Sequence, residues 1–600
     1  MLGVQFILAF ITALLFSLAI IPVTLRVAAA YGLFDLPDSP TPIIIQTSAQ
    51  TRTGAKSDPP RRIHSKPIPR LGGIAIVVGF FLSVLVGPRP TGVTGIFAAS
   101  LLLFATGLCD DIKPLSAKLR LVLQLLSATL AVWSSKLIIT TITLTPHFAF
   151  NLPMWLGFIV SIFIVVGAVN AVNMIDGLDG LAGGVVLIGV CLLSYLHFLA
   201  TQDLYLLLVF SVPLIGAILG FLKYNTHPAC IFMGDCGSNW LGFMVGILFL
   251  FLLCGAKMSP NGSALIYNSE HLTSGKTLPF LSVVLCMALP IFDTAWVILG
   301  RIRDGLSPMT PDKRHFHHGL LKLGLSHPQS VAASYFIALV FGVVGAVSEA
   351  FPQHNTWWLP FLSASFLFAL MPAILKLDEG ALQILRSQRI QLSRSSSYGP
   401  KLGVLIRYWE TANRYTIYVI LLAIPIFAGV PPKVIGYAAA ASIFLLIMSV
   451  FFKSKQVDFF QSLILVVAST VLLAANNANE IFVQVDGQKI YLQFIYNSMF
   501  IWLAVSTLCF VIVTFRKQYF LITPSDFLMV MFPLLLLIVP QPYNEIHRLN
   551  IIGLRSLVLF MAIRSMVKRH VQVQYRLRLV LLVATIFVFC VSVIGVRVVY

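Results

Sequence analysis

The chain has only 22 Asp and Glu residues, and five of them fall in three short motifs. The first motif ends in the pair Asp110-Asp111, with Lys113 and Lys118 a few residues later. Two adjacent carboxylates repel each other unless a cation or a basic partner is near. The pair therefore predicts a base or a metal-assisting group beside a phosphate, with lysine as counter-charge. A solvated helix end is the alternative.

The second motif is NAVNMIDGLDGLAGG, residues 170–184, and it contains Asp176 and Asp179. Carboxylates three residues apart share a face where the segment is helical. The glycines allow the backbone to approach a ligand closely. Helix capping alone would not require two Asn and two Asp within ten residues. The motif therefore predicts a ligand site.

The third motif, FMGDCGS, places Asp235 between glycines just before an apolar segment. Carboxylate oxygen suits Mg²⁺, which takes one or two carboxylates together with substrate phosphates. The alternative is a turn in which Asp235 caps a helix.

Two further motifs are basic. The segment 311–319, PDKRHFHHG, could bind a transition metal or a nucleotide diphosphate. We favour the diphosphate, because no Cys or Glu completes a zinc ligand set. The segment 61–73, RRIHSKPIPRLGG, could anchor a helix or meet an anionic lipid head group, and taken alone it favours the anchor. Asp293 lies inside an apolar segment, where a charge usually faces the bundle interior.

The composition requires a membrane around these motifs. Of the 600 residues 58% are hydrophobic and 10% are charged, whereas soluble domains carry about 25% charged residues. Long apolar runs predict helices rather than barrel strands. The net charge of +19 lies in loops between apolar runs, so we attribute it to the positive-inside rule and expect no nucleic acid partner. The eight Cys show no spacing typical of a disulfide framework.

The sequence predicts an all-α polytopic membrane protein of about eleven helices, followed by about seven more. We divide it into a membrane domain over 1–376, a basic linker over 377–413 and a C-terminal membrane domain over 414–600. The predicted spans are 3–27, 71–88, 92–109, 119–139, 153–171, 181–200, 203–222, 238–256, 278–299, 329–349 and 357–376, then 414–430, 434–452, 458–475, 491–515, 518–540, 549–567 and 578–598.

An apolar N-terminus without a basic region predicts a first helix that starts outside rather than a signal peptide. Alternating from there places most of the 41 Lys and Arg residues on the inner side. All the chemically rich motifs fall on that side, which predicts a site facing the cytosol.

Together the five motifs, in this order, resemble the polyprenyl-phosphate N-acetylhexosamine-1-phosphate transferases. That family includes enzymes that start O-antigen, enterobacterial common antigen and teichoic acid synthesis, and the phospho-MurNAc-pentapeptide translocase. The resemblance covers about residues 1–376. It implies a Mg²⁺-dependent site, with Mn²⁺ as the alternative ion, on the cytosolic face of a bacterial inner membrane.

By position, the resemblance makes Asp235 the Mg²⁺ ligand and assigns the lipid phosphate to Asp110 and Asp111. It places Asn173, Asp176 and Asp179 at the uridine-side and catalytic site, and Asn225 in the nucleotide pocket. The remaining basic residues are expected to contact phosphate groups: Lys66, Arg70, Lys118, Arg314, His315, His317 and His318.

The resemblance implies that the chain transfers a sugar-1-phosphate from a UDP-sugar to undecaprenyl phosphate and releases UMP. The form of the histidine motif favours UDP-GlcNAc, while UDP-GalNAc, UDP-QuiNAc and UDP-FucNAc stay open. So do the peptidoglycan translocase reaction, a homodimer and, from another class, a transporter. The chain departs from the family in about 20 extra residues near 39–59 and in the region 414–600.

Overall fold

The structure is a computed structural model of the whole chain. It describes residues 2–35, 67–85, 92–145, 147–201, 203–258, 265–266, 278–307, 314–350, 356–375, 411–423, 433–451, 467–469, 471–473, 482–485, 488–491, 493–515, 528, 549–567 and 571–594.

Each of the eleven spans predicted for residues 1–376 falls on a helical segment of the structure. Among the described residues, seven helices are long and apolar enough to cross a bilayer, which confirms the all-α, multi-pass membrane class. The segments are α1 (Leu2–Tyr31), α2 (Gly72–Val84), α3 (Thr94–Ile112), α4 (Ala117–Ser135), α5 (Met154–Ile175), α6 (Leu181–Thr201), α7 (Leu204–Leu206), a π-helical turn (Leu207–Ser211), α8 (Val212–Asn225), α9 (Gly234–Leu253), α10 (Phe280–Leu285), α11 (Ala288–Arg303), α12 (Phe316–Lys322), α13 (His327–Ala350) and α14 (Leu359–Leu375).

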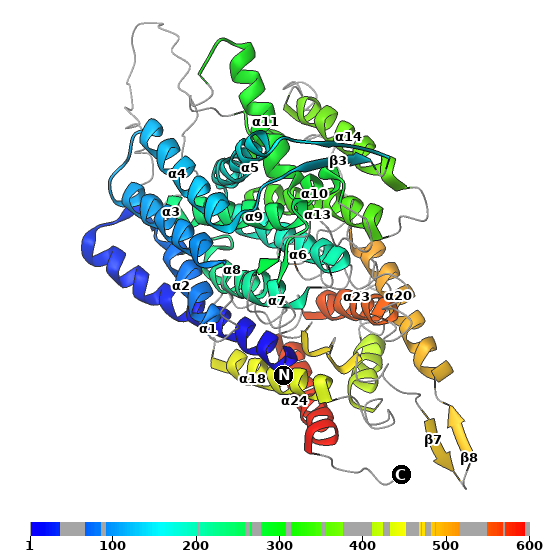
Figure 1. Ribbon diagram of the computed structural model, residues 1–600. Coiled ribbons are helices and arrows are strands. Elements are labelled where there is room, and N and C mark those ends of the chain that lie inside the picture. Colours follow the sequence, from blue (N-terminus) through cyan, green and yellow to red (C-terminus); the bar gives the residue numbers. More distant parts are fainter. Residues whose placement is uncertain are drawn as a thin grey trace, which may run out of the picture.

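The described C-terminal segments lie along one side of this bundle, where α18 contacts α1 (Figure 1). Residues 411–413, predicted as the end of the linker, are already helical, while 377–410 and the extra residues 39–59 lie outside the described part. The segments are a helix over 411–418 with a π-helical continuation (Val419–Ala423), α18 (Lys433–Phe451), α20 (Gln493–Phe515), α23 (Leu549–Val567), and α24 (Val571–Phe589) with a π-helical end (Cys590–Ile594).

The structure differs from the predicted spans where backbone chemistry interrupts a helix. The predicted span 278–299 breaks between α10 and α11, because the Pro290 ring would clash with the carbonyl of Cys286 in a continuous helix. The predicted span 119–139 ends at Ser135, where Lys136 takes a left-handed φ of 55°.

Four short antiparallel pairs were not predicted. Strands of two to five residues are too short for a hydrophobic period to reveal. They are β1 (Phe34–Asp35) with β2 (Ile68–Pro69), β3 (Thr141–Thr145) with β4 (Phe148–Asn151), β5 (Lys257–Met258) with β6 (Leu265–Ile266), and β7 (Phe482–Val485) with β8 (Gln488–Tyr491).

Helix α9 occupies the centre of the bundle and packs against α2, α3, α5 and α6. Its side chains are buried almost along its whole length, including Trp240, whose ring meets that of Phe80 edge to face at 5.1 Å. Glycines allow this close packing, because a Cβ at Gly242 would lie 2.5 Å from the Cα of Val169 on α5. A helix surrounded in this way fixes the position of its first turn.

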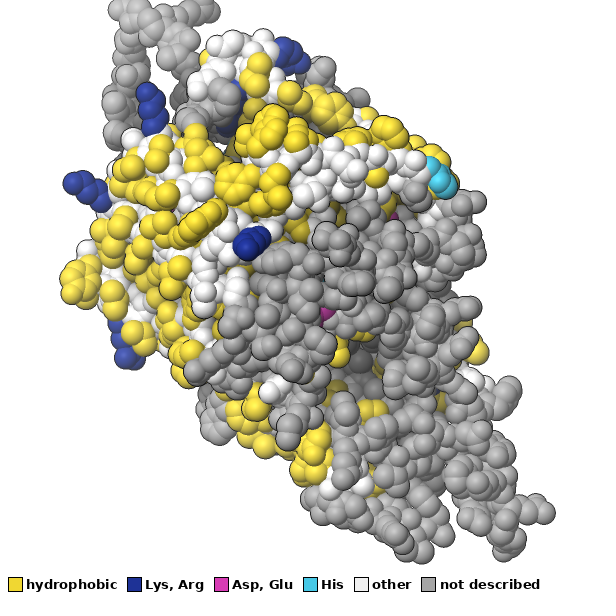
Figure 2. Space-filling view, viewed as in Figure 1, with side chains coloured by type: hydrophobic (Ala, Val, Ile, Leu, Met, Phe, Trp, Pro, Cys, Tyr) yellow, Lys and Arg dark blue, Asp and Glu magenta, His cyan; other side chains and the backbone are white. Residues whose placement is uncertain are grey.

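The outside of the bundle is apolar. On the face shown in Figure 2, hydrophobic side chains cover much of the described surface, and Lys and Arg side chains lie singly. Large exposed side chains include Trp133 on α4 and Trp155 and Phe163 on α5. Such a surface suits contact with lipid rather than water.

Candidate active site

The first turn of α9 is held by a carboxylate from another helix. Asp111, on the last turn of α3, accepts hydrogen bonds from the backbone N–H groups of Asp235 at 2.8 Å and Cys236 at 2.9 Å. The first N–H groups of a helix lack intrahelical partners and favour negative charge. Asp111 therefore caps α9, and both of its oxygens are used.

Asp110 and Asp235 share one basic side chain. Nη1 of Arg120, on α4, lies 2.9 Å from Oδ2 of Asp110 and 3.4 Å from Oδ2 of Asp235. Asp110 is buried, and its Oδ1 also accepts a hydrogen bond from Leu115 N–H at 2.6 Å. Asp235 and Asp110 also share a side-chain hydrogen bond. The side chain of Asp235 is 30% exposed and that of Asp110 is 4% exposed, so Asp235 is the more accessible of the two to a ligand.

Glycines bring these helices into contact. A Cβ at Gly107 would lie 2.5 Å from the carbonyl oxygen of Asp235, and one at Gly234 would lie 2.6 Å from Oδ2 of Asp111. Gly234 also has a φ of +74°, which favours glycine. The glycines beside Asp110-Asp111 and Asp235 thus serve the approach of α3 to α9.

Two predicted ligand residues border this cluster. Oδ1 of Asn173, near the end of α5, accepts a hydrogen bond from the Ser238 hydroxyl on α9 at 3.0 Å. Arg70, between β2 and α2, pairs with the buried Asp35 at 2.8 Å. Its positive charge also acts on Asp111 and Asp176.

The segment that carries Asp176 and Asp179 is not helical, so the prediction that both share a helix face is wrong. It is the loop between α5 and α6, where Gly180 takes a φ of +79° that a right-handed helix excludes. Asn225 supports this loop, since its Oδ1 accepts the Gly180 N–H at 2.9 Å and its Nδ2 donates to the Ile231 carbonyl. The buried Tyr335 hydroxyl donates to the Gly180 carbonyl.

The two loop carboxyls titrate differently. Burial raises the pKa of Asp176 to about 7, the negative charge of Asp111 adds to this, and Arg70 opposes it. Burial also acts to raise the pKa of Asp179. Hydrogen bonds from His227 and Ala229 N–H and the charge of His327 outweigh it, and the pKa falls below its usual range. Asp176 can thus exchange a proton near neutral pH, while Asp179 stays ionised.

The histidine motif meets the same loop. A Cβ at Gly177 would lie 2.5 Å from Nε2 of His317, so the imidazole lies directly against the loop. Burial, followed by neighbouring histidines, holds the pKa of His317 well below its usual range. The buried Asp293 anchors the motif, because its carboxylate bonds to Nδ1 of His315 at 2.9 Å and to the Phe316 N–H at 2.7 Å. The ring of His318 lies 4.4 Å from that of His317.

Three further residues were predicted to contact phosphate groups. Lys118 is exposed on the first turn of α4, and Lys66 lies outside the described residues. Arg314 pairs with the exposed Asp304 at the end of α11. The structure brings Asp110, Asp111, Asn173 and Asp235 together at α9, and His317 against the loop of Asp176 and Asp179.

The sequence analysis missed four residues that hold the site together. Arg120 lies two residues beyond the favoured Lys118 and is the cation that reaches the carboxylates. The sequence analysis gave no role to His227, His327 or Tyr335. Their partners lie 48, 148 and 155 residues away, so no local pattern could identify them.

Comparisons with known proteins identify the family of the chain. The model of glycosyl transferase family 4 matches residues 93–253, which include the carboxylate cluster and the loop. A Bacillus subtilis protein named probable undecaprenyl-phosphate N-acetylglucosaminyl 1-phosphate transferase is 32% identical over 375 residues, covering 62% of this chain and 91% of its own length.

Two other relatives carry related names. The decaprenyl-phosphate N-acetylglucosaminephosphotransferase of Mycolicibacterium smegmatis is 33% identical over 326 residues, 50% of this chain and 76% of its own. The Escherichia coli K12 undecaprenyl-phosphate alpha-N-acetylglucosaminyl 1-phosphate transferase is 23% identical over 324 residues, 51% of this chain and 80% of its own. The chain therefore belongs to glycosyl transferase family 4, among the polyprenyl-phosphate N-acetylglucosaminyl 1-phosphate transferases.

Proposed function

We propose that the chain transfers N-acetylglucosamine 1-phosphate from UDP-GlcNAc to undecaprenyl phosphate and releases UMP. The observation that best supports this proposal is that Asp110, Asp111 and Asp235 lie together at the first turn of α9, beside the loop of Asp176. The donor sugar and the polyprenyl acceptor follow the name of the Bacillus subtilis relative, of which the chain covers 91%. The Mycolicibacterium name gives decaprenyl phosphate, so acceptor length is the finer part of the proposal.

A divalent cation of the Mg²⁺ type fits the site at Asp235. The Asp235 side chain is 30% exposed, and carboxylate oxygen is the donor this ion prefers. An ion bound there would take the place of the proton in the hydrogen bond between Asp110 and Asp235. When bound there, the ion would neutralise the donor diphosphate and stabilise the charge of departing UMP.

The chemistry requires a phosphate oxygen of the acceptor to attack the β-phosphorus of the donor. One P–O bond forms, the bond to UMP breaks, and UMP leaves with the bonding electrons. Because one phosphoanhydride replaces another, the reaction should be reversible. A phosphate monoester has a second pKa of about 6, so the acceptor is largely dianionic at neutral pH.

The acidic residues then have separate tasks. Asp111 is fully engaged as the cap of α9, and Asp110 holds Arg120, so both position the site rather than take a proton. Asp176 has a pKa of about 7 and can keep the acceptor phosphate deprotonated. The sequence analysis predicted that Asp110 or Asp111 acts as the base, whereas this proposal assigns the base to Asp176 in the loop.

The histidine motif and loop suit the donor diphosphate. His317 is neutral and lies against Gly177, so its imidazole can donate one hydrogen bond at the loop. His315 is held by Asp293, which fixes the start of α12 beside it. We place this site on the cytosolic face of a bacterial inner membrane, where UDP-sugars are available.

The test is turnover by the purified full chain in detergent with undecaprenyl phosphate, Mg²⁺ and a panel of UDP-sugars. UMP release and lipid-linked product are measured, with Asp235→Ala as the inactive variant and Asp203→Asn, at the start of α7, as a control. Mg²⁺-dependent turnover of UDP-GlcNAc that Asp235→Ala loses is expected. Turnover of UDP-MurNAc-pentapeptide alone would reject the proposed donor, and no turnover of any donor by folded protein would reject the transferase proposal.

A further inference from the structure

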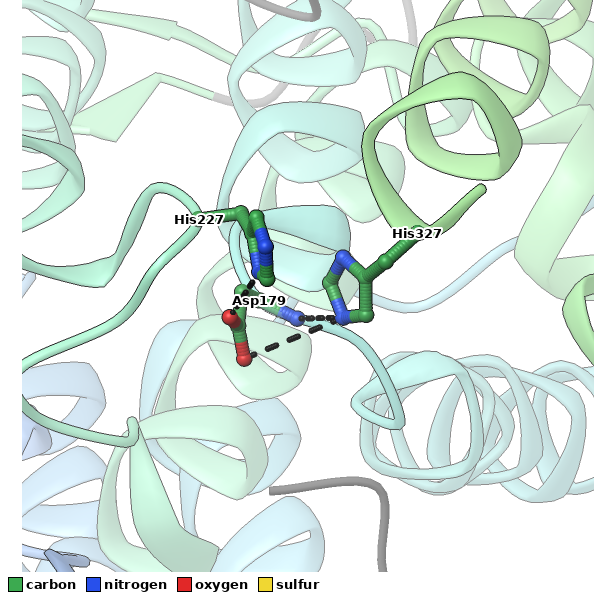
Figure 3. A group of neighbouring side chains, drawn as sticks. All are labelled: Asp179, His227 and His327. Atoms are coloured by element: carbon green, nitrogen blue, oxygen red, sulfur yellow. Dashed lines mark hydrogen bonds and ion pairs between the residues drawn. The ribbon is translucent and has the colours of Figure 1, made fainter. Parts of the chain in front are cut away.

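Three side chains from separate segments meet at Asp179. Asp179 comes from the loop between α5 and α6, His227 from the loop after α8, and His327 is the first residue of α13 (Figure 3). One nitrogen of each imidazole and one carboxylate oxygen all lie within 4.8 Å of one another. The cluster lies outside the carboxylate cluster at α9 and outside the histidine motif.

Both imidazoles turn a nitrogen toward the same carboxylate. Nδ1 of His227 lies 2.7 Å from Oδ2 of Asp179, and Nε2 of His327 lies 3.9 Å from Oδ1. The two rings stack with centroids 4.5 Å apart and planes 25° apart. Two positively charged rings at this distance would repel each other, so the stack favours at least one neutral imidazole.

The hydrogen bonds leave one pair of acceptors facing each other. Nε2 of His327 accepts the backbone N–H of Asp179 at 3.2 Å, so this nitrogen carries a lone pair. Oδ2 of Asp179 accepts bonds from His227 and from the Ala229 N–H, whereas Oδ1 accepts none from the described residues. Nε2 of His327 and Oδ1 of Asp179 thus lie 3.9 Å apart with no proton between them. A cation bound here would take the Nε2 lone pair in place of the Asp179 N–H, would displace the Nδ1 proton of His227, and would also be bound by Oδ1.

We propose that Asp179, His227 and His327 bind one divalent transition-metal ion of the Zn²⁺ type, at a site separate from Asp235. Two imidazoles and one carboxylate suit such an ion, whereas Mg²⁺ prefers oxygen ligands. In a tetrahedral zinc site the donor atoms lie about 3.3–3.6 Å apart, since each lies about 2.0–2.2 Å from the metal. The present atoms lie within 4.8 Å of one another, so ion binding would draw them closer together.

The surroundings allow the ion to enter and to bind. The side chain of His227 is 42% exposed, so the site opens to solvent, while those of His327 and Asp179 are 12% and 14% exposed.

Bound there, the ion links three segments that the backbone does not connect directly. The loop of Asp179 also carries Asp176 and contacts His317. The ion would therefore fix this loop against α13 and against the loop after α8, which carries His227. This inference does not rest on the proposed reaction, because it concerns ion binding and loop position alone.

The experiment measures Zn²⁺ binding to the full chain, purified with a tag that contains no histidine and stripped with a chelator. Elemental analysis after equilibration should find one Zn²⁺ per chain, retained in excess Mg²⁺. Affinity should fall at least tenfold in His227→Gln and in His327→Gln. His147→Gln, an exposed histidine of the β3–β4 hairpin, and Asp235→Asn should bind as the wild type does.

A second readout keeps the test independent of variant folding. Zn²⁺ should raise the thermal unfolding midpoint of the wild type and leave that of the double variant His227→Gln, His327→Gln unchanged, while the midpoints measured in chelator show whether the variants fold. Co²⁺ absorption in the visible range should report nitrogen ligands in the wild type alone. Failure of the wild type to bind zinc, or full binding by the double variant, would overturn the proposal.

Discussion

The carboxylate cluster at α9 and the loop between α5 and α6 are assembled in different ways. In the cluster, Asp111 binds backbone N–H groups of a helix that is buried on all sides. In the loop, Asp179 is held chiefly by side chains, those of His227 and His327, which come from distant segments. One part is fixed by packed helices. In the other, buried hydrogen bonds with Asn225 and Tyr335 fix Gly180, while the contact of Asp179 with His227 lies near solvent.

This difference makes the cluster at α9 the more rigid part of the site and the loop between α5 and α6 the more adaptable part. Helix packing fixes backbone positions closely, because packed interiors resist displacement. The Asp179 end of the loop depends on a partly exposed contact with His227, and exposed contacts open at lower free energy. The cluster is therefore suited to hold charged groups in place, and the loop is suited to adjust when a nucleotide sugar enters and leaves.

Asp235→Asn should have the largest effect on turnover and little effect on stability. The variant removes the more exposed carboxylate of the Asp110–Asp235 pair, and we expect turnover to fall about 1,000-fold. The new amide can donate to Asp110 and so keep their hydrogen bond, and the unfolding midpoint should therefore stay level. UMP release and thermal unfolding of the same preparation test both parts. A lower midpoint would show that Asp235 is structural.

Asp111→Asn should lower both the turnover and the stability of the protein. The amide offers one acceptor oxygen where the carboxylate offered two, so the N–H of Asp235 or of Cys236 loses its partner. We expect a loss of about 1–3 kcal/mol in stability and about a 100-fold loss of turnover as the first turn of α9 shifts. The thermal unfolding midpoint and the rate of UMP release should fall together. Loss of turnover with a normal midpoint would instead favour a direct catalytic role.

Gly177→Ala tests the contact between the loop and the histidine motif. The new methyl group would lie 2.5 Å from Nε2 of His317, and we expect a loss of about 1–3 kcal/mol and roughly tenfold slower turnover. Gly167→Ala is the matched control, since a Cβ there meets nothing within 4 Å on helix α5. That control should keep turnover and gain slightly in stability. Equal behaviour of the two variants would contradict the contact.

The sequence predicted the cluster better than the loop, for physical reasons. Short local motifs identified the cluster residues: Asp110 and Asp111 are adjacent, and Asp235 lies between glycines. Apolar runs predicted the helices that carry them. The loop was given helical spacing because Asp176 and Asp179 are three residues apart, although Gly180 requires a positive φ. The partners of Asp179 could not be predicted, because a contact across 148 residues leaves no local pattern.

The smallest expected effect concerns pH and the buried histidine of the loop region. The folded pKa of His317 lies well below its usual value, so the unfolded chain binds a proton first as the pH falls. The resulting stability is full above about pH 6.5 and is lost as the pH falls toward the folded pKa, by at most about 1.4 kcal/mol per pH unit.

His317→Asn should therefore reduce the drop in unfolding midpoint between pH 7.5 and pH 5.5, both chosen to span about 6.5. His147→Asn, exposed in the β3–β4 hairpin, should leave that drop as in the wild type. The cluster at α9 has no histidine among its described contacts, so this pH response should belong to the loop alone. An unchanged drop in His317→Asn would mean that other groups set the acid sensitivity, and that the two parts of the site do not differ in this respect.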